Sequence, residues 1–133
     1  MFGKLVLAMM LAHFVSDFTL QGILADLKQE RWWRKKVQGD LETSKYRNDY
    51  VVALIVHSMY WSACIVAPFA FTGYVDTQCW SVLFAINAAL HALIDNLKAN
   101  TRAINLVQDQ CFHGIQLVIT ALIMLIAHCV ARG

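Results

Sequence analysis

Long apolar segments alternate with polar connections along this chain. The apolar residues concentrate in four ranges, about 3–25, 50–72, 79–98 and 104–130. Each range is near the roughly 20 residues that an α-helix needs to cross the hydrocarbon core of a bilayer. The second and third segments are followed by the short connections TGYVDTQ and ANTRAIN, and short loops join antiparallel neighbours. The pattern predicts an all-α polytopic membrane protein, in which residues 1–133 form one domain built as an antiparallel bundle of four transmembrane helices.

The composition favours a membrane protein over a soluble helical bundle. Hydrophobic residues make up 59% of the chain and charged residues 15%, whereas soluble domains carry about 45–50% and roughly 25%. Helices of a soluble bundle would also show a continuous polar face, and these segments show isolated polar residues instead. The first run, MFGKLVLAMMLAHF, resembles a signal peptide but has no small-x-small cleavage motif, so we expect a retained span.

Lysine and arginine are distributed unevenly between the two predicted sides. The first loop, residues 26–49, contains seven of them: Lys28, Arg31, Arg34, Lys35, Lys36, Lys45 and Arg47. The connection after the third segment adds Lys98 and Arg102, and the other side has only Lys4 and Arg132. The positive-inside rule therefore predicts that the first loop is cytoplasmic and that both termini lie outside the cytoplasm.

The first loop permits two interpretations. Trp32 and Trp33 stand beside three basic residues, a composition typical of a segment that rests on anionic headgroups. The basic residues also suffice as a plain determinant of topology. The net charge of +2 does not suggest a nucleic-acid partner.

Ionisable residues interrupt the apolar segments in a repeated pattern. The motifs HFVSD, HALID and DQCFH each place a His and an Asp four residues apart, on one helical face. Together with one isolated histidine, the set comprises His13, Asp17, His57, His91, Asp95, Asp109 and His113. Counting from the predicted cytoplasmic ends puts four at one depth, roughly 10–15 Å below the surface: Asp17, His57, His91 and His113. Asp95, Asp109 and Gln21 are expected in a shallower layer and His13 in a deeper one.

Two readings of this set differ in their consequences. Buried polar side chains can hold membrane helices together. Intramembrane Asp and His are nevertheless costly, so that a functional site is the first hypothesis. Imidazoles with carboxylates suit a divalent metal, Zn²⁺ best, with Fe²⁺ or Mn²⁺ as further options.

The predicted metal site assigns a role to each member of the set. The candidate ligands are His57, His91 and His113, with Asp17 as a fourth ligand or general base and Asp95 and Asp109 in a second sphere or at a second metal. His13 is the remaining candidate ligand. The candidate catalytic residues are the carboxylates Asp17, Asp95 and Asp109.

The other reactive residue types do not form a predicted site. Four cysteines are scattered without a CxxC pair, which indicates neither a disulfide framework nor a thiolate metal site. Ser16 and Ser58 neighbour the key residues but are expected on other faces, so a serine hydrolase is not predicted. His128 has no nearby Asp and is expected at the outer interface.

Several motifs together resemble a known family. HFVSDFTLQ, the isolated His57, HALIDNLK and DQCFHGIQ are similar to a group of small bacterial and phage inner-membrane proteins classed as domain of unknown function 3307. The resemblance covers all four segments, and HxxxDFxLQ, HxxID…K and DQxxH are its most specific parts. It implies a multi-pass protein of the bacterial inner membrane and brings no established substrate. More distantly, the His/Asp pattern resembles small membrane-bound metal-dependent hydrolases.

These observations leave three hypotheses for function. The first is a metal-dependent hydrolase of a lipid-linked or headgroup substrate, whose anionic headgroup Lys98, Arg102 and the first loop would attract. The second is an ion- or proton-conducting transporter subunit, for which four spans would require a homo-oligomer. The third is a non-enzymatic membrane factor that binds another protein through the first loop.

Overall fold

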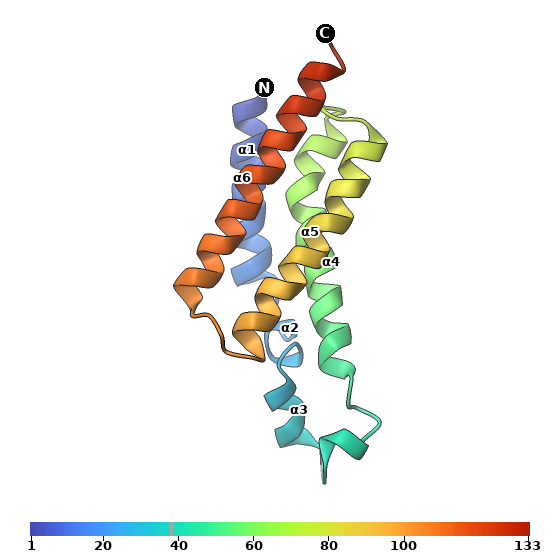
Figure 1. Ribbon diagram of the computed structural model, residues 1–133, viewed down its shortest axis with the longest axis vertical. Helices are drawn as coiled ribbons and strands as arrows, with labels where there is room; N and C mark the ends of the chain where they lie inside the picture. Colours follow the sequence, from blue (N-terminus) through green and yellow to red (C-terminus); the bar gives the residue numbers. More distant parts are fainter. Residues whose placement is uncertain (38) are drawn as a thin grey trace.

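The computed structural model describes residues 1–37 and 39–133, and it is helical throughout that part of the chain, without a strand. Four long helical segments form an elongated bundle (Figure 1). They are α1 with its continuation η1 (Phe2–Phe14, Val15–Thr19), α4 (Asp49–Phe71), α5 (Thr77–Ala99) and α6 (Leu106–Val130). Both termini lie at one end of the bundle, which we call the terminal end (Figure 1). The predicted all-α four-helix bundle is confirmed.

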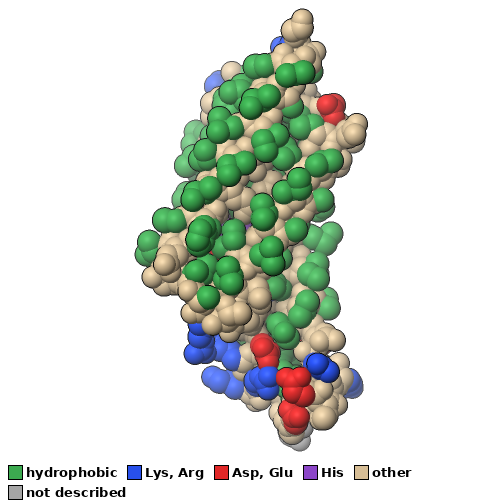
Figure 2. Space-filling view, in the orientation of Figure 1, with side chains coloured by type: hydrophobic (Ala, Val, Ile, Leu, Met, Phe, Trp, Pro, Cys, Tyr) green, Lys and Arg blue, Asp and Glu red, His purple; other side chains and the backbone are tan. Residues whose placement is uncertain are grey.

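All four segments are long and apolar enough to cross a membrane. Only 17% to 44% of each apolar stretch is buried inside the protein, so most of its apolar side chains face outward. Figure 2 shows this outer surface, where hydrophobic side chains cover α5 and α6 and charged ones gather at the end opposite the termini. Such a surface is stable in lipid and not in water. The chain is therefore a membrane protein.

Three of the four helices agree with the predicted ranges to within two residues, and the first span is shorter than predicted. It ends at Thr19 instead of residue 25. Its last turn is a π-helix, in which the N–H of Leu20 donates to the carbonyl of Val15 at 2.8 Å. Gly22, with φ of +48°, then turns the chain away from the helix axis. Gln21 consequently lies beyond the end of the helix, although the predicted range 3–25 includes it.

The first loop has secondary structure of its own at the end opposite the termini, which we call the basic end. Its elements are α2 (Leu24–Leu27), α3 (Glu30–Lys36) and the 3₁₀ turn η2 (Leu41–Thr43). Trp33 packs inward, since its indole N–H donates to the Leu27 carbonyl at 2.8 Å and its ring stacks on Tyr46. Asn100 joins this segment to the α5–α6 connection by accepting from the Glu30 N–H at 2.8 Å. The loop is thus held against the bundle.

The interior of the bundle changes character along its length. Large apolar side chains fill the half near the terminal end, and Trp61, Ile65 and Phe69 of α4 have no exposed surface there. Along α5 the buried positions recur every fourth residue, and they run from apolar to ionisable: Leu83, Asn87, His91 and Asp95. The same side of one helix therefore contributes to the apolar core first and to the polar cluster afterwards.

Candidate metal centre

Six of the seven predicted ionisable residues meet inside the bundle near its basic end. They come from all four membrane segments: Asp17 from η1, His57 from α4, His91 and Asp95 from α5, Asp109 and His113 from α6. None of the six is more than 4% exposed. We refer to these six residues as the His/Asp cluster. Its assembly agrees with the expected convergence of side chains from separate spans.

The predicted layers merge because helical side chains lean toward the N-terminus of their helix. On α5, the Asp95 carboxylate points back toward His91, and its Oδ2 lies 3.7 Å from His91 Nε2. On α6, the His113 ring points back toward Asp109, and Nε2 lies 3.5 Å from Asp109 Oδ1. A residue expected one turn shallower thus brings its charged atoms to the same depth.

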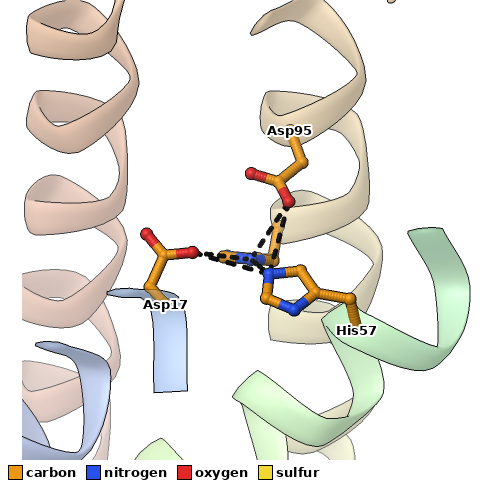
Figure 3. A group of neighbouring side chains, drawn as sticks. Asp17, His57 and Asp95 are labelled. Carbon is orange, nitrogen blue, oxygen red and sulfur yellow. Dashed lines mark hydrogen bonds and ion pairs between the residues drawn. The ribbon is translucent and has the colours of Figure 1, made fainter. Parts of the chain in front are cut away.

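A first group of four donor atoms surrounds one point. It consists of Asp17, His57, His91 and Asp95, whose nearest ligand atoms all lie within 4.8 Å of one another. His57 Nε2 is 3.2 Å from His91 Nε2, 3.5 Å from Asp17 Oδ1 and 3.4 Å from Asp95 Oδ2. Figure 3 shows the two carboxylates approaching the His57 ring from different helices.

These separations match the edges of a coordination tetrahedron. Nitrogen and oxygen ligands lie about 2.0–2.1 Å from Zn²⁺, which places neighbouring donors of a tetrahedral site about 3.3 Å apart. The four donors of the first group have edges of 3.2 Å to 3.9 Å wherever a pair is in contact. Small side-chain shifts would bring all four donor atoms to ligand distance from one ion. If hydrogen bonds held the set together instead, each pair of donor atoms would share one proton.

A second group of three donors adjoins the first. It comprises Asp17, Asp109 and His113, again with ligand atoms within 4.8 Å of one another. The second oxygen of Asp95, Oδ1, lies 3.6 Å from His113 Nε2. The sequence grouped His113 with His57 and His91; the structure puts it with Asp17 and Asp109 instead. Asp17 is common to both groups, and Asp95 faces both.

His13 lies outside both groups, beside them. Its Nδ1 accepts from the Trp61 indole N–H at 2.9 Å, and because indole can only donate, Nε2 carries the proton of a neutral ring. That proton faces Gln110 Oε1 at 3.3 Å. The Gln110 amide in turn donates to Asp17 Oδ2 and Asp109 Oδ2, at 3.0 Å each. His13 therefore orients Gln110, and Gln110 orients two carboxylates.

Two lysines that the sequence assigned to topology and to attraction of a headgroup reach the cluster. Lys28, 7% exposed, donates to Asp95 Oδ2 at 2.5 Å from the short helix α2. Lys98, near the end of α5, donates to Asp109 Oδ2 at 2.7 Å. A count of charges could have signalled them, because buried carboxylates in lipid need positive partners. Both pairs lie on the side of the basic end.

The aromatic side chain of Trp61 closes the cluster toward the terminal end. Its ring stacks on His91 with centroids 4.1 Å apart, and the His91 ring packs on His113 at 4.2 Å. The π-turn on the first segment contributes as well. By widening one turn of the helix it buries Ser16 and Asp17 side by side, whereas neither neighbour, Val15 or Phe18, is buried.

Several atoms of the cluster have no hydrogen-bond partner within the described part of the chain. They are the Nδ1 atoms of His57 and His91, both ring nitrogens of His113, and Asp109 Oδ1. Buried polar atoms are almost always paired, and an unpaired one costs about 1–3 kcal/mol. Of these atoms, His113 Nε2 and Asp109 Oδ1 face each other at 3.5 Å, as ligands of a cation do, whereas His57 and His91 face the first group with Nε2.

The remaining reactive side chains are placed elsewhere or already engaged. The Ser16 and Ser58 hydroxyls donate to backbone carbonyls of their own helices, at 2.7 Å and 2.8 Å. The cysteines are free thiols. The His128 Nδ1–H donates to the Tyr74 carbonyl at 2.6 Å, and the ring stacks on that tyrosine, apart from the cluster residues.

Two hollows adjoin the cluster. A cavity of about 360 Å³ at the basic end is lined by four cations, Lys28, Arg31, Lys98 and Arg102. Between α1 and α6 runs an apolar groove of about 700 Å³, lined among others by Met9, Met10 and Gly114. Gly114 directly follows His113, and a Cβ at that glycine would meet nothing within 4 Å. Its missing side chain therefore widens the groove next to the cluster.

Comparison with models of protein families, with curated proteins and with solved structures finds no match for this chain. The fold and the cluster define it as an all-helical membrane protein with a buried His/Asp group able to hold a divalent metal. The resemblance to domain of unknown function 3307 stays a prediction.

Proposed function

We propose that this protein is a metal-dependent hydrolase of the membrane, acting on a lipid that carries an anionic, phosphate-containing headgroup. The observation that supports the metal is the near-tetrahedral arrangement of Asp17, His57, His91 and Asp95. Zn²⁺ fits this mixture of imidazole and carboxylate, as would Fe²⁺ or Mn²⁺. A bound Zn²⁺ lowers the pKa of a ligated water toward about 7 and so makes hydroxide available near neutral pH.

The chain's own residues suit this reaction. Asp17, Asp95 and Asp109 have carboxylate oxygens that would bind such an ion, and one of them not bound to it would accept the proton of the attacking water. Arg31 and Arg102 stand in the basic cavity, beside the lysines that bond the cluster. A phosphate group there would face guanidinium and ammonium donors, which recognise it well. Hydrolysis would add water at phosphorus and release the lipid alcohol and inorganic phosphate.

The apolar groove supports a lipid as the source of that headgroup. It opens along the membrane-spanning surface between α1 and α6, and its inner end reaches Gly114 beside His113. An acyl chain in the groove would place its headgroup toward the basic end, where the cations lie. With the predicted orientation, the substrate would enter from the cytoplasmic leaflet.

A conducting pathway is less well supported. The cluster forms a polar chain, but toward the terminal end it meets Trp61, Ile65 and Phe69, none of which has exposed surface. An ion crossing the monomer would have to pass this apolar layer. The hypotheses of a homo-oligomeric transporter and of a loop-mediated protein partner remain predictions.

Metal analysis of the detergent-purified protein tests the proposal first. After loading with Zn²⁺ and removal of free ion, the wild type should retain bound metal, and His91→Ala should lose it. His128→Ala is the matched control, since it removes a histidine outside the cluster and should retain the metal. A wild-type protein without stoichiometric Zn²⁺, Fe²⁺ or Mn²⁺ under these conditions would remove the basis of the proposal.

Hydrolysis is tested separately with phosphatidic acid in mixed micelles. We expect release of inorganic phosphate by the metal-loaded wild type and none after chelation. Gly114→Leu, which fills the groove, should slow release while metal content is unchanged. Gly3→Leu is its control, because Gly3 is exposed on α1, outside the groove, and its Cβ would also meet nothing within 4 Å. Metal binding without phosphate release would restrict the proposal to a metal protein.

A further inference from the structure

We propose that the cluster holds two divalent ions, and that the second position, formed by Asp17, Asp109 and His113, is the one at which water and substrate bind. This inference rests on the proposed function, because it requires that the first group also binds metal. It divides the cluster into a position with four protein donors and a position with three.

The second position has its own unpaired donors. His113 Nε2 and Asp109 Oδ1 are fully buried, neither has a hydrogen-bond partner among the described residues, and the two atoms lie 3.5 Å apart. Their separation again matches a coordination edge of about 3.3 Å. A buried polar atom without a hydrogen-bond partner indicates a position for a ligand, and here two such atoms face each other.

Asp17 and Asp95 lie between the two groups of donors, which is where a ligand shared by two ions has to lie. Asp17 belongs to both groups. Asp95 directs Oδ2 toward His57 at 3.4 Å and Oδ1 toward His113 at 3.6 Å. Sites with two ions about 3.5–4 Å apart use the pair to stabilise both the attacking and the leaving oxygen of a displacement. In this proposal Asp17 is the shared ligand, and Asp95 belongs to the first position through Oδ2, so the second position keeps three protein donors.

The two positions differ in how many protein donors they offer. Four donors saturate a tetrahedral ion, whereas three leave one coordination site for water or substrate. Both positions are joined to the basic cavity through a lysine that lines it, since Asp95 bonds Lys28 and Asp109 bonds Lys98. The four-donor ion would then hold the carboxylates in place, and the three-donor ion would present the hydroxide.

The net charge of the cluster affects how strongly a second divalent ion can bind. Three aspartates and two lysines leave one net negative charge when the histidines are neutral. One divalent ion reverses that charge, and a second raises the positive excess in a low-dielectric interior, which is unfavourable without an anion. The alternative to a second ion is a protonated His113 between Asp95 and Asp109. We therefore expect inorganic phosphate to strengthen binding of the second ion.

The experiment counts ions per chain. The full-length protein in detergent is titrated with Co²⁺, whose visible absorption reports occupancy, and ion content is measured with and without inorganic phosphate. We expect two ions for the wild type with phosphate, one for His113→Ala and one for the nearly isosteric Asp109→Asn. His128→Ala should still bind two. Circular dichroism and a monodisperse elution profile show whether each variant is folded.

The possible results separate the two proposals. One ion in the wild type and one in both variants overturns the second position and leaves the first intact. Loss of all metal in both variants also overturns it, because the donors would then serve a single site. A wild type without metal contradicts the proposed function as well. Two ions in the wild type, reduced to one by either substitution, support the two-position centre.

Discussion

Two groups of buried polar side chains lie inside the bundle, and they differ in how their atoms are paired. Near the middle of the bundle, Asn87 of α5 meets Gln116 and Thr120 of α6. The Gln116 amide donates to Asn87 Oδ1 and to its carbonyl, each at 2.8 Å, and Thr120 donates to the same Oδ1 at 3.0 Å. This group is uncharged, and Gln116 Oε1 is its one atom without a partner within the described residues.

The His/Asp cluster, which begins about one turn nearer the basic end, lacks such pairing. Carboxylates approach one another, imidazole nitrogens of His57 and His91 face each other at 3.2 Å, and several atoms have no partner in the described chain. Polar residues that only hold helices together resemble the Asn87 group. The cluster therefore has donor atoms, unpaired among the described residues, to which a cation could bind, and the two lysines pair with only some of its carboxylate oxygens.

Substitution of the shared ligand Asp17 should have the largest effect on metal affinity, and a substitution in the Asn87 group should have none. Asp17→Ala removes the carboxylate common to both metal positions. We expect it to weaken metal binding by at least about 100-fold, since even residues behind the ligands contribute about 10–100-fold. Isothermal titration with Zn²⁺ in detergent measures the effect, and Asn87→Ala should bind like the wild type. Equal affinities for Asp17→Ala and wild type would contradict the assignment.

The next effect concerns the buried ion pair. Lys28→Met leaves the Asp95 carboxylate without its ammonium partner, and breaking such a pair costs about 3–5 kcal/mol. The loss should be largest in the chelated protein and smaller with Zn²⁺ bound, because the ion supplies positive charge. Unfolding in mixed detergent, with and without EDTA, measures both values. Lys98→Met should cost less, since that side chain is 34% exposed; an equal loss with and without metal would argue against an ion near Asp95.

A smaller loss of stability should follow from disrupting the neutral group. Asn87→Leu removes the acceptor of Thr120 and of the Gln116 amide, and polar contacts between membrane helices contribute about 1 kcal/mol. The same unfolding measurement should show this decrease, identical with and without EDTA. A dependence on metal would mean that the Asn87 group and the cluster are coupled.

The smallest effect is expected at the surface of the basic end. Arg34 bonds Glu30 and Glu42 at the surface, where 48% of the Arg34 side chain is exposed, and ion pairs at the surface contribute little. Its bonds to Glu30, and then to Glu42, raise the pKa of the guanidinium above an already high value, so its charge does not vary with pH. Arg34→Ala should leave both unfolding and metal content unchanged. A measurable loss would show that α3 stabilises the cluster.

The fold could be predicted from the sequence because lipid excludes charges from all but a few positions. Each helix of the bundle appears as an apolar run, and the turns TGYVDTQ and ANTRAIN separate α4, α5 and α6 within two residues of their observed ends. The convergence of His57, His91 and His113 followed from counting residues along antiparallel spans. Helical periodicity also placed Asp95 and Asp109 on the correct faces.

What the sequence did not reveal depends on contacts between distant segments. Lys28 reaches Asp95 only because α2 folds back against the bundle, and its position beside other basic residues suggested topology or headgroup attraction and no contact with the cluster. Gln110 looks like one more polar residue at a helix start, and its bonds to two carboxylates depend on how α1 packs on α6. The division of the histidines into two groups depends on ring orientation, which spacing does not determine.

The π-turn at Val15–Thr19 is equivalent to the insertion of one residue into the first helical segment. Relative to an α-helix the segment accommodates one additional residue, and deleting one position there would restore uniform backbone bonding while rotating everything after it by about 100°. Such a shortened chain could form a more regular first span and still lose the carboxylate that both halves of the centre share. The irregular last turn of the first span thus determines where the two carboxylate oxygens of Asp17 lie.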